Sequence, residues 1–549
     1  MKNALYYGDN LDILRRHIAD ESVDLTYLDP PFNSNADYNV LFREHGGAGA
    51  AAQIKAFSDT WGWNIDAARA FEDVVETGGR ISVTLQAFRQ MLGDSDMLAY
   101  IAMMAPRLIE LHRVLKPSGS LYLHCDPTAS HYLKIVLDAI FGPESFRNEI
   151  VWRRTTAKAH NTVRFSRAHD IILYYAKGPT SKFNLQYTKH REEYLESHYS
   201  QIEPGTNRRY TLGDLLNPNK NRPNLTYEFP PGSGSVRVWR WTKERMMEAF
   251  KNGLIVVPKA GGVPRFKRYL DEQEGTPTTD VWEDIPPINS QAQERLGYPT
   301  QKPEALLRRI LTASADRGDT VLDPFCGCGT TISVAEQLGM SWIGIDVTHL
   351  AIGLIKHRLQ DQFGPAVAKT YDVRGEPTSL PDAERLAGEE PFQFQAWALG
   401  KVGARTAQSE KRGADRGIDG ALYFHDDPKG TTKRIILSVK AGKNVSVAMV
   451  RDLVGTVTRE KADIGVLLTM TPPTAPMVKE AASAGFYASP MGGKHAKVQI
   501  LTVAELLDGK GIDYPARSQR ADVTFRRARR VVAEPQALPL SVDPEPGDD

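Results

Sequence analysis

Apolar residues along positions 1 to 175, and again along 300 to 360, alternate between short strand-like runs and stretches with helical spacing. Short apolar runs bounded by turn residues indicate buried strands, whereas apolar residues three and four positions apart indicate helices. The pattern predicts strands at 4–8, 23–28, 120–124, 148–152, 171–175, 320–322 and 341–345, and helices at 11–17, 97–115, 130–141, 303–315, 330–338 and 350–359. This alternation predicts an α/β protein with a doubly wound sheet of parallel strands.

The rest of the chain divides by composition. Residues 33–94 have a mixed pattern that suggests loops, and residues 177–289 are irregular and rich in Pro, Gly, Asn and Tyr. A polar, Pro- and Gly-containing stretch at 366–390 is predicted to be a linker, and a second α/β unit is expected at 391–513. The tail, 514–549, contains an arginine cluster followed by Pro and acidic residues and is predicted to be disordered.

Length and charge narrow the protein class. At 549 residues the chain is too long for one hydrophobic core, so two or three domains are expected. The formal net charge of +1 gives no global argument for nucleic-acid binding. Residues 151–300, however, hold 23 Lys and Arg against 16 Asp and Glu, a net of +7, with aromatic residues interleaved at 237–243. Such a segment suits contact with phosphates and bases, although a solvated lid would have the same composition.

The compartment is expected to be a reducing cytoplasm. No segment approaches the roughly 20 apolar residues of a membrane span, and the first residues have no signal-peptide pattern. Three cysteines, Cys125, Cys326 and Cys328, cannot frame a disulfide scaffold and have poor spacing for zinc. The oligomeric state stays open, a homodimer included.

The first candidate site follows the predicted strand 23–28. Asp29, Pro30, Pro31 and Phe32 come directly after it. The amino nitrogen of a nucleic-acid base is a poor nucleophile, so catalysis requires hydrogen-bond acceptors for its N–H bonds. Asp29 offers one acceptor, the carbonyl of Pro30 in a stiff proline turn offers another, and Phe32 offers a stacking face. A strand that simply ends in an Asp-Pro turn is the alternative for the isolated motif.

The second candidate site follows the predicted strand 320–322. Gly327 and Gly329 lie in a turn where absent Cβ atoms would let a ligand approach the backbone. Thr330 opens the next helix, whose N-terminus favours a carboxylate, and Asp346 closes the following strand, where it can accept from ribose hydroxyls. The candidate cofactor residues here are Asp323, Phe325, Gly327, Gly329, Thr330 and Asp346. A glycine turn alone is weak evidence, because many strand–helix junctions need glycine for packing.

In this order, the two motifs resemble those of β-group DNA amino-methyltransferases that use S-adenosylmethionine. That group has a Lys-Pro element before the cofactor strand, which Lys302 and Pro303 match, and a Gly-Asp-Asn near the cofactor, which Gly8, Asp9 and Asn10 match. The resemblance therefore implies that Asp9, Asn10, Lys302 and Pro303 lie at the cofactor site. It also implies a Rossmann-like sheet.

The resemblance spans residues 1–365 and implies double-stranded DNA as the substrate. It also implies that the inserted stretch 177–289 reads the DNA sequence. Asp29 at the first motif position is commoner among adenine-N6 enzymes, while cytosine-N4 enzymes usually have Ser there. The expected reaction is methylation of adenine N6 within a restriction–modification or epigenetic system, with cytosine N4 as the alternative. A non-catalytic DNA-binding scaffold is disfavoured, because the motif residues are retained.

In the unit at 391–513, Asp419 precedes one strand and Lys440 ends the next, a pattern that could hold Mg²⁺ for phosphodiester cleavage. With these residues the unit also resembles Mrr-type restriction endonucleases of the PD-(D/E)XK fold. Ser438, however, stands where that family has Glu or Gln, and the preceding helix lacks the expected Glu. Glu389, Glu390 or Asp415 are possible substitutes. A nuclease-derived, non-cleaving domain and a bifunctional methyltransferase–endonuclease both remain open.

Overall fold

The chain forms two compact units, residues 1–184 with 280–549 and residues 185–279, and each is described by itself. The computed structural model describes residues 2–31, 62–155, 165–258, 262–289, 292–298, 300–406, 417–427, 430–442, 444–515, 524–525 and 527–531. Phe32, Asp415 and the end of the tail from 532 therefore lie outside the described residues.

The first part of the larger unit is built on a nine-stranded sheet in the order β14-β4-β5-β3-β2-β15-β16-β1-β17. Its strands are β1 (Asn3–Tyr7), β2 (Val23–Leu28), β3 (Leu115–Cys125), β4 (Phe146–Arg153), β5 (His169–Ala176), β14 (Val281–Trp282), β15 (Thr320–Asp323), β16 (Ser341–Asp346) and β17 (Tyr371–Arg374). All neighbours are parallel except β5, which is antiparallel to both β3 and β4. The predicted parallel pairing thus holds for the other neighbours. Strand β5 differs because β4 and β5 are consecutive strands that pair directly, and an antiparallel pair needs no crossover helix.

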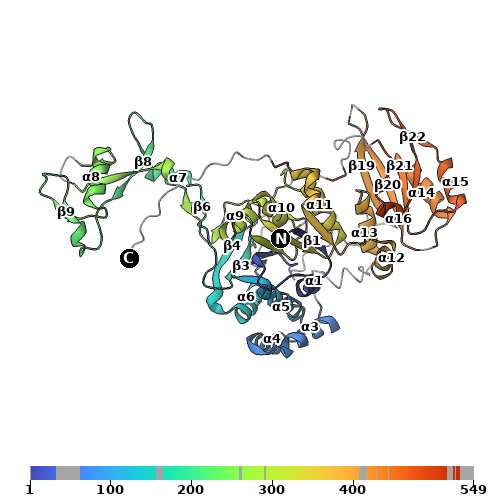
Figure 1. The fold of residues 1–549 in the computed structure, drawn as a ribbon, viewed down its shortest axis with the longest axis horizontal. Helices are drawn as coiled ribbons and strands as arrows, with labels where there is room; N and C mark the ends of the chain where they lie inside the picture. The colour runs from blue at the N-terminus through green and yellow to red at the C-terminus, as the bar shows by residue number, and fades with distance from the viewer. Residues whose placement is uncertain are drawn as a thin grey trace. The chain divides into compact units, whose positions relative to one another are not determined.

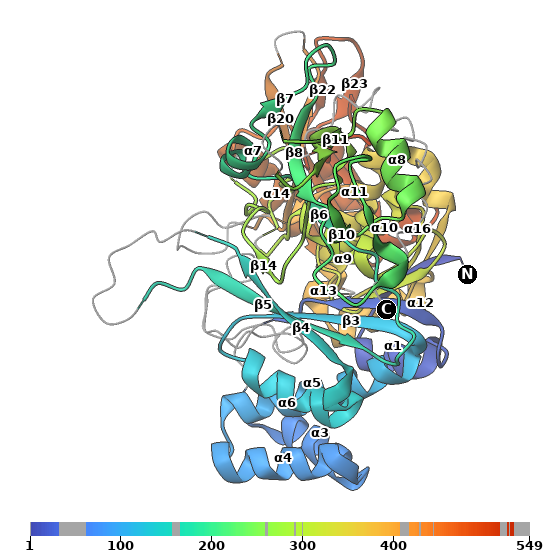
Figure 2. The same ribbon diagram turned by 90° about the vertical axis from the view of Figure 1, so that its left-hand side faces the viewer.

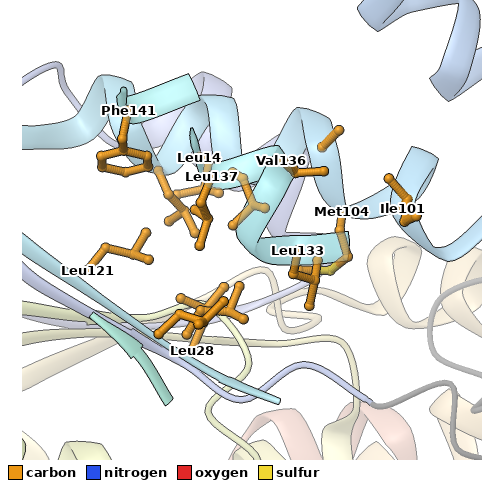
Figure 3. Packing of buried hydrophobic residues seen from close by; sticks show 14 of the residues in the cluster. Leu14, Leu28, Ile101, Met104, Leu121, Leu133, Val136, Leu137 and Phe141 are labelled. Atoms are coloured by element: carbon orange, nitrogen blue, oxygen red, sulfur yellow. The ribbon is translucent and has the colours of Figure 1, made fainter. Parts of the chain in front are cut away.

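One face of this sheet is covered by two layers of helices. Residues that alternate along the strands, Leu28 and Leu121 among them, point toward Leu133 and Leu137 of the covering helices (Figure 3). The covering helices are α1 (Asn10–His17), α5 (Asp96–Val114) and α6 (Ser130–Phe141), with α3 (Ile65–Glu76) and α4 (Gly79–Leu92) packed outside them (Figure 2). Positions 65–92, expected to be mixed and loop-rich, are therefore mostly helical, because their apolar residues share one face that the other helices bury.

The opposite face is covered by α9 (Glu304–Ser314), α10 (Thr330–Gln337) and α11 (His349–Phe363) (Figure 1). Ile310 of α9, Ile332 of α10 and Ile355 of α11 are fully buried in the same cluster as Leu25 of β2. Because helices cover both faces, the predicted doubly wound, Rossmann-like architecture is confirmed. None of the helices within the described ranges is long and apolar enough to span a membrane.

Residues 185–279 form a small unit with its own core. Trp239 is fully buried there, with Phe229 and Met246 packed in the same cluster. The unit contains β6 (Tyr187–Thr188), α7 (Glu192–His198), β7 (Gln201–Ile202), β8 (Arg209–Asp214), β9 (Thr226–Glu228), β10 (Val236–Val238), α8 (Lys243–Lys251), β11 (Ile255–Val256), β12 (Arg265–Tyr269) and β13 (Thr276–Pro277). The stretch expected to be irregular is therefore folded, with strands too short to give a clear periodic pattern.

The C-terminal part contains a five-stranded sheet in the order β18-β19-β20-β21-β24. Clusters of buried apolar residues cover both faces of this sheet, which confirms a second α/β domain. Its elements are α12 (Leu380–Glu389), α13 (Pro391–Lys401), β18 (Arg405–Thr406), β19 (Gly420–His425), β20 (Thr432–Lys440), α14 (Val447–Arg459), β21 (Ile464–Thr469), α15 (Ala475–Ser483), β22 (Phe486–Ala488), β23 (Lys494–Ala496), β24 (Val498–Thr502) and α16 (Val503–Leu507).

The predicted linker and tail contain ordered structure. Within 366–390, β17 pairs in parallel with β1 and extends the large sheet, and α12 follows it. In the tail, Thr524 Oγ1 accepts from the Tyr423 amide at 2.9 Å, and the Ala528 amide donates to Asp361 Oδ2 at 3.1 Å. The predictions of a plain linker and of a wholly disordered tail were therefore wrong for these segments, because polar composition did not reveal their backbone pairing.

Candidate active site

The two predicted motifs follow the carboxyl ends of two neighbouring central strands of the large sheet. β2 and β15 pair in parallel, with Leu25 opposite Val321 and Thr26 opposite Leu322. Parallel strands end at the same edge, so Asp29 and the turn after β15 leave the sheet side by side. Two segments almost 300 positions apart in the chain therefore lie next to each other in the structure.

Asp29 forms an ion pair across this edge. The Lys302 ammonium group donates to Asp29 Oδ2, and both side chains are largely shielded from water. Pro303, the next residue, is the N-cap of α9, so that helix fixes the place of Lys302. Lys302 was expected at the cofactor, and the structure pairs its ammonium group with the catalytic candidate Asp29. Pro30 is buried, whereas Phe32 lies outside the described residues.

The turn after β15 requires glycine for two different reasons. Gly327 and Gly329 have φ angles of +49° and +73°, which L side chains rarely adopt. A Cβ on Gly329 would lie 2.7 Å from Ile355 Cγ1, and one on Gly327 would lie 3.3 Å from the Tyr298 ring. The expectation that both glycines clear space for a ligand was therefore incomplete, because Gly329 primarily lets α11 pack closely.

Two carboxylates border this turn, the buried Asp323 and the half-buried Asp346. Asp346 Oδ2 accepts from the Gly327 amide at 2.9 Å, and Asp346 Oδ1 accepts from the Thr348 amide at 2.9 Å. Burial raises the pKa of Asp346 to about 6 despite these hydrogen bonds. Burial also raises the pKa of Asp323 to about 7, and the negative charges of Asp29 and Asp346 contribute to that rise. The edge is thus an acidic cluster that favours a cationic ligand.

The Gly-Asp-Asn segment lies against the same turn. Asp9 caps α1 by accepting from the Leu11 amide at 2.8 Å, and Asn10 Nδ2 donates to the Pro324 carbonyl at 2.9 Å. Arg107 of α5 joins the two, donating to Asn10 Oδ1 at 2.6 Å and to Asp9 Oδ2 at 2.7 Å. Sequence reasoning missed Arg107, although a lone arginine within a buried apolar helix pattern was an available signal.

The start of α10 is tied to α9 and α11. Arg358 is almost fully buried and donates to Thr330 Oγ1 at 3.0 Å, to the Cys328 carbonyl at 3.3 Å and to Glu304 Oε1 at 2.8 Å. The Thr330 hydroxyl, a predicted cofactor contact, is therefore already engaged by Arg358. Phe325 is partly buried, and its amide donates to Asp323 Oδ1 at 3.1 Å. These contacts hold the turn in one conformation.

Comparison with known proteins places this geometry in a family. A family model described as DNA methylase matches residues 23–356, more than half of the chain. The chain belongs to the DNA methylase family. It is 28% identical over 364 residues to the type II methyltransferase M.EcaI of Enterobacter cloacae, covering 65% of this chain and 69% of the relative.

A second relative belongs to a larger assembly. The type III restriction-modification enzyme StyLTI Mod subunit of Salmonella typhimurium is 28% identical over 352 residues, covering 61% of this DNA methylase and 50% of the relative. The chain thus spans half the length of that relative. A solved structure of a putative DNA modification methylase from Thermus thermophilus, complexed with S-adenosyl-L-methionine, has 15% identity and a TM-score of 0.32, covering 68% of this chain and 100% of that one.

The C-terminal domain of this DNA methylase matches a different family model. Residues 391–508 match one described as NACHT-associated inactive restriction endonuclease 1. Asp419 Oδ2 accepts from the Val439 amide at 2.6 Å and from Ser438 Oγ at 3.2 Å, so β20 engages this carboxylate oxygen. Across the described parts of the chain, no group of three or more His, Cys, Asp or Glu is placed to hold a metal ion. A Mg²⁺ site at Asp419 and Lys440 stays a prediction.

Proposed function

We propose that the protein transfers a methyl group from S-adenosylmethionine to the N6 amino group of adenine in double-stranded DNA. The observation that carries the proposal is the emergence of Asp29 and the glycine turn from adjacent parallel strands at one sheet edge. An amino-group acceptor and a cofactor turn need this adjacency, since the two reactants must meet in line.

The residues around the turn fit S-adenosylmethionine. Its sulfonium group is a cation, and Asp29, Asp323 and Asp346 form the acidic cluster described above. Asp346 would hold the ribose hydroxyls, Asn10 and the Gly327 backbone would border the ligand, and the N-terminus of α10 would favour its carboxylate. Bound there, the cofactor supplies an electrophilic methyl group.

The chain's own groups would bind and orient the amino group. Lys302 donates to Oδ2 of Asp29, and we propose that the other oxygen, Oδ1, accepts a hydrogen bond from the base. Pro30 and Pro31 have no amide N–H, so the Pro30 carbonyl is a second acceptor in a stiff turn. Phe32 is proposed to stack on a base rotated out of the duplex. Two acceptors localise the nitrogen lone pair toward the methyl group.

Adenine is proposed over cytosine because aspartate opens the catalytic motif. To test this, the protein is incubated with DNA and S-adenosylmethionine carrying a tritiated methyl group, and the DNA is digested to nucleosides. We expect label in N6-methyladenine. Label in N4-methylcytosine would contradict the choice of base, and unlabelled DNA would contradict methyl transfer itself.

Residues 185–279 are proposed to read the DNA sequence. They form a separate compact unit within the basic stretch, and Arg245 lies 4.6 Å from the centre of the Trp241 ring. Arginine and aromatic side chains together suit phosphate and base contacts. The StyLTI Mod subunit is named as part of a type III restriction-modification enzyme, which supports a place for this protein in such a system.

The C-terminal domain is proposed to be a nuclease-derived domain that does not cleave DNA. The engagement of Asp419 by Ser438 and Val439 supports this, as does the word inactive in the description of the matching family. Supercoiled plasmid incubated with the protein and Mg²⁺ should remain uncut, in methylated and unmethylated form. Cleavage that disappears in Lys440→Ala would instead establish the bifunctional alternative.

A further inference from the structure

A chain of buried polar side chains crosses three neighbouring strands beside Asp29. The Tyr27 hydroxyl of β2 lies 2.9 Å from His124 Nδ1 of β3, and His124 Nε2 lies 3.2 Å from Asp170 Oδ2 of β5. All three side chains are almost completely shielded from water, with relative exposures of 2%, 0% and 1%. Buried polar groups of this kind are costly unless they are paired.

The strand register brings this chain next to the catalytic candidate. Leu28 of β2 pairs with Leu123 of β3, so the next two positions along these parallel strands are Asp29 and His124. Side chains alternate between faces along a strand, which gives Tyr27 and Asp29 the same face. Tyr27 also packs in the cluster beneath α9, α10 and α11, the helices that cover that face.

The hydrogen bonds of this chain run in one direction. Arg154 Nε lies 3.0 Å from Asp170 Oδ1. Burial acts to raise the pKa of Asp170, but His124, Lys302 and Arg154 outweigh it and hold that pKa below its usual value. Burial, with Asp29 next in effect, raises the pKa of Tyr27, so its phenol stays protonated. The Asp170 carboxylate beside Nε2 favours the Nε2–H tautomer of His124, and in that tautomer Nε2–H donates to Asp170 while the phenol donates to Nδ1.

Among the described residues, the backbone pairing of β2 with β3 stops just before Asp29. The register of the two strands ends at Leu28, and the two prolines after Asp29 cannot donate hydrogen bonds. The orientation of Asp29 therefore depends on Lys302 and on the residues that anchor the end of β2. Tyr27, two positions earlier, is such an anchor.

We propose that Tyr27, His124 and Asp170 are positioning residues that fix the end of β2 so that Asp29 faces the amino group of the base. This inference rests on the proposed methyl transfer and deepens it. All three side chains are buried, so their effect on the reaction would operate through Asp29.

The first test compares two buried tyrosines. Tyr27→Phe removes only the Tyr27 hydroxyl, which lies 2.9 Å from His124 Nδ1. The matched control is Tyr122→Phe, because Tyr122 pairs with Tyr27 in the β2–β3 register, is equally buried, and uses its hydroxyl at 2.6 Å from Ser314 Oγ instead. We expect kcat for methyl transfer to fall about 10- to 100-fold in Tyr27→Phe, with the KM for DNA and the Kd for S-adenosylmethionine unchanged. The control should lower the melting temperature comparably and leave kcat unchanged. Equal kcat values in both variants would overturn the proposal.

A double-mutant cycle tests whether the chain acts as one unit. Asp170→Asn can donate to His124 Nε2, which would move the imidazole proton to Nδ1 and remove the acceptor for Tyr27. Since either change breaks the same chain, the double variant should have the kcat of Tyr27→Phe alone. Losses that multiply in the double variant would contradict a common unit.

Nitrogen NMR of histidine-labelled full-length protein separates this inference from the proposed function. The His124 signals should report an Nε2–H tautomer, and its Nδ1 signal should shift in Tyr27→Phe but not in Tyr122→Phe. An Nδ1–H tautomer would contradict the proposed hydrogen bonds from Tyr27 to His124 and from His124 to Asp170, even if the enzyme is active. A wild-type protein that has the expected tautomer but transfers no methyl group would contradict the proposed function instead.

Discussion

The acidic cluster predicts that Asp323 lowers the stability of the free protein at alkaline pH. Asp323→Asn keeps the size of the side chain and an oxygen that can accept from the Phe325 amide, but removes a charge buried beside Asp29 and Asp346. The pKa of Asp323 rises from 3.8 to about 7 on folding, because burial penalises the carboxylate. The folded state therefore holds this proton more tightly than the unfolded state does.

The size of the effect follows from the linkage between protonation and folding. Stability from this group is fully present below pH 3.8 and is lost as pH rises through about 7. At about 1.4 kcal/mol per pKa unit, the loss is on the order of 4 kcal/mol. The variant should consequently be more stable than wild type at pH 8 by up to that amount, and equally stable near pH 4. It should also bind S-adenosylmethionine more weakly, because the sulfonium loses an anionic neighbour.

Urea unfolding of the full-length protein provides the assay, with hydrogen exchange measured on peptides from β15 and β16. The free energy of unfolding of wild type should fall between pH 5 and pH 8, and that of Asp323→Asn should fall by much less. Parallel pH profiles for the two proteins would refute the argument. So would a variant that is less stable than wild type at pH 8.

Two further variants test packing, one in the turn at the site and one in the core on one face of the large sheet. Gly329→Ala should destabilise the fold by at least about 1–2 kcal/mol, since its φ is +73° and the new Cβ would meet Ile355 at 2.7 Å; an unchanged melting temperature with normal S-adenosylmethionine binding would contradict this. Leu121→Ala should cost roughly 2–5 kcal/mol in urea unfolding, because Leu121 is fully buried between β3 and the helices of one face. A cost below about 1 kcal/mol for Leu121→Ala would show that this core is not tightly packed there.

Local sequence patterns revealed the parts of the fold that depend on nearby residues. The strand carrying Asp29 and the turn carrying Gly327 follow from apolar runs and motif spacing, and their adjacency follows from the topology of a doubly wound sheet. The helices between 65 and 92 and the strand β17 escaped prediction, because their regular structure comes from packing against distant elements.

The polar partners of the site could not be read in the same way. Arg107 meets Asn10 across 97 positions of sequence, and His124 meets Asp170 across 46. No local spacing encodes such pairs, since the strand order decides which side chains meet. Lys302 was found by its motif, but its pairing with Asp29 needed the three-dimensional arrangement.

The most direct test of the account replaces the carboxylate on which it depends. Asp29→Ala is compared with Asp452→Ala, which removes an exposed carboxylate from α14 in the C-terminal domain. Transfer of tritiated methyl groups to DNA should fall at least about 100-fold in Asp29→Ala, the loss typical of removing a group that stabilises the reacting centre. Calorimetry should still detect S-adenosylmethionine binding in that variant, and the control should match wild type in both measurements. Methyl transfer at the wild-type rate by Asp29→Ala would contradict the account.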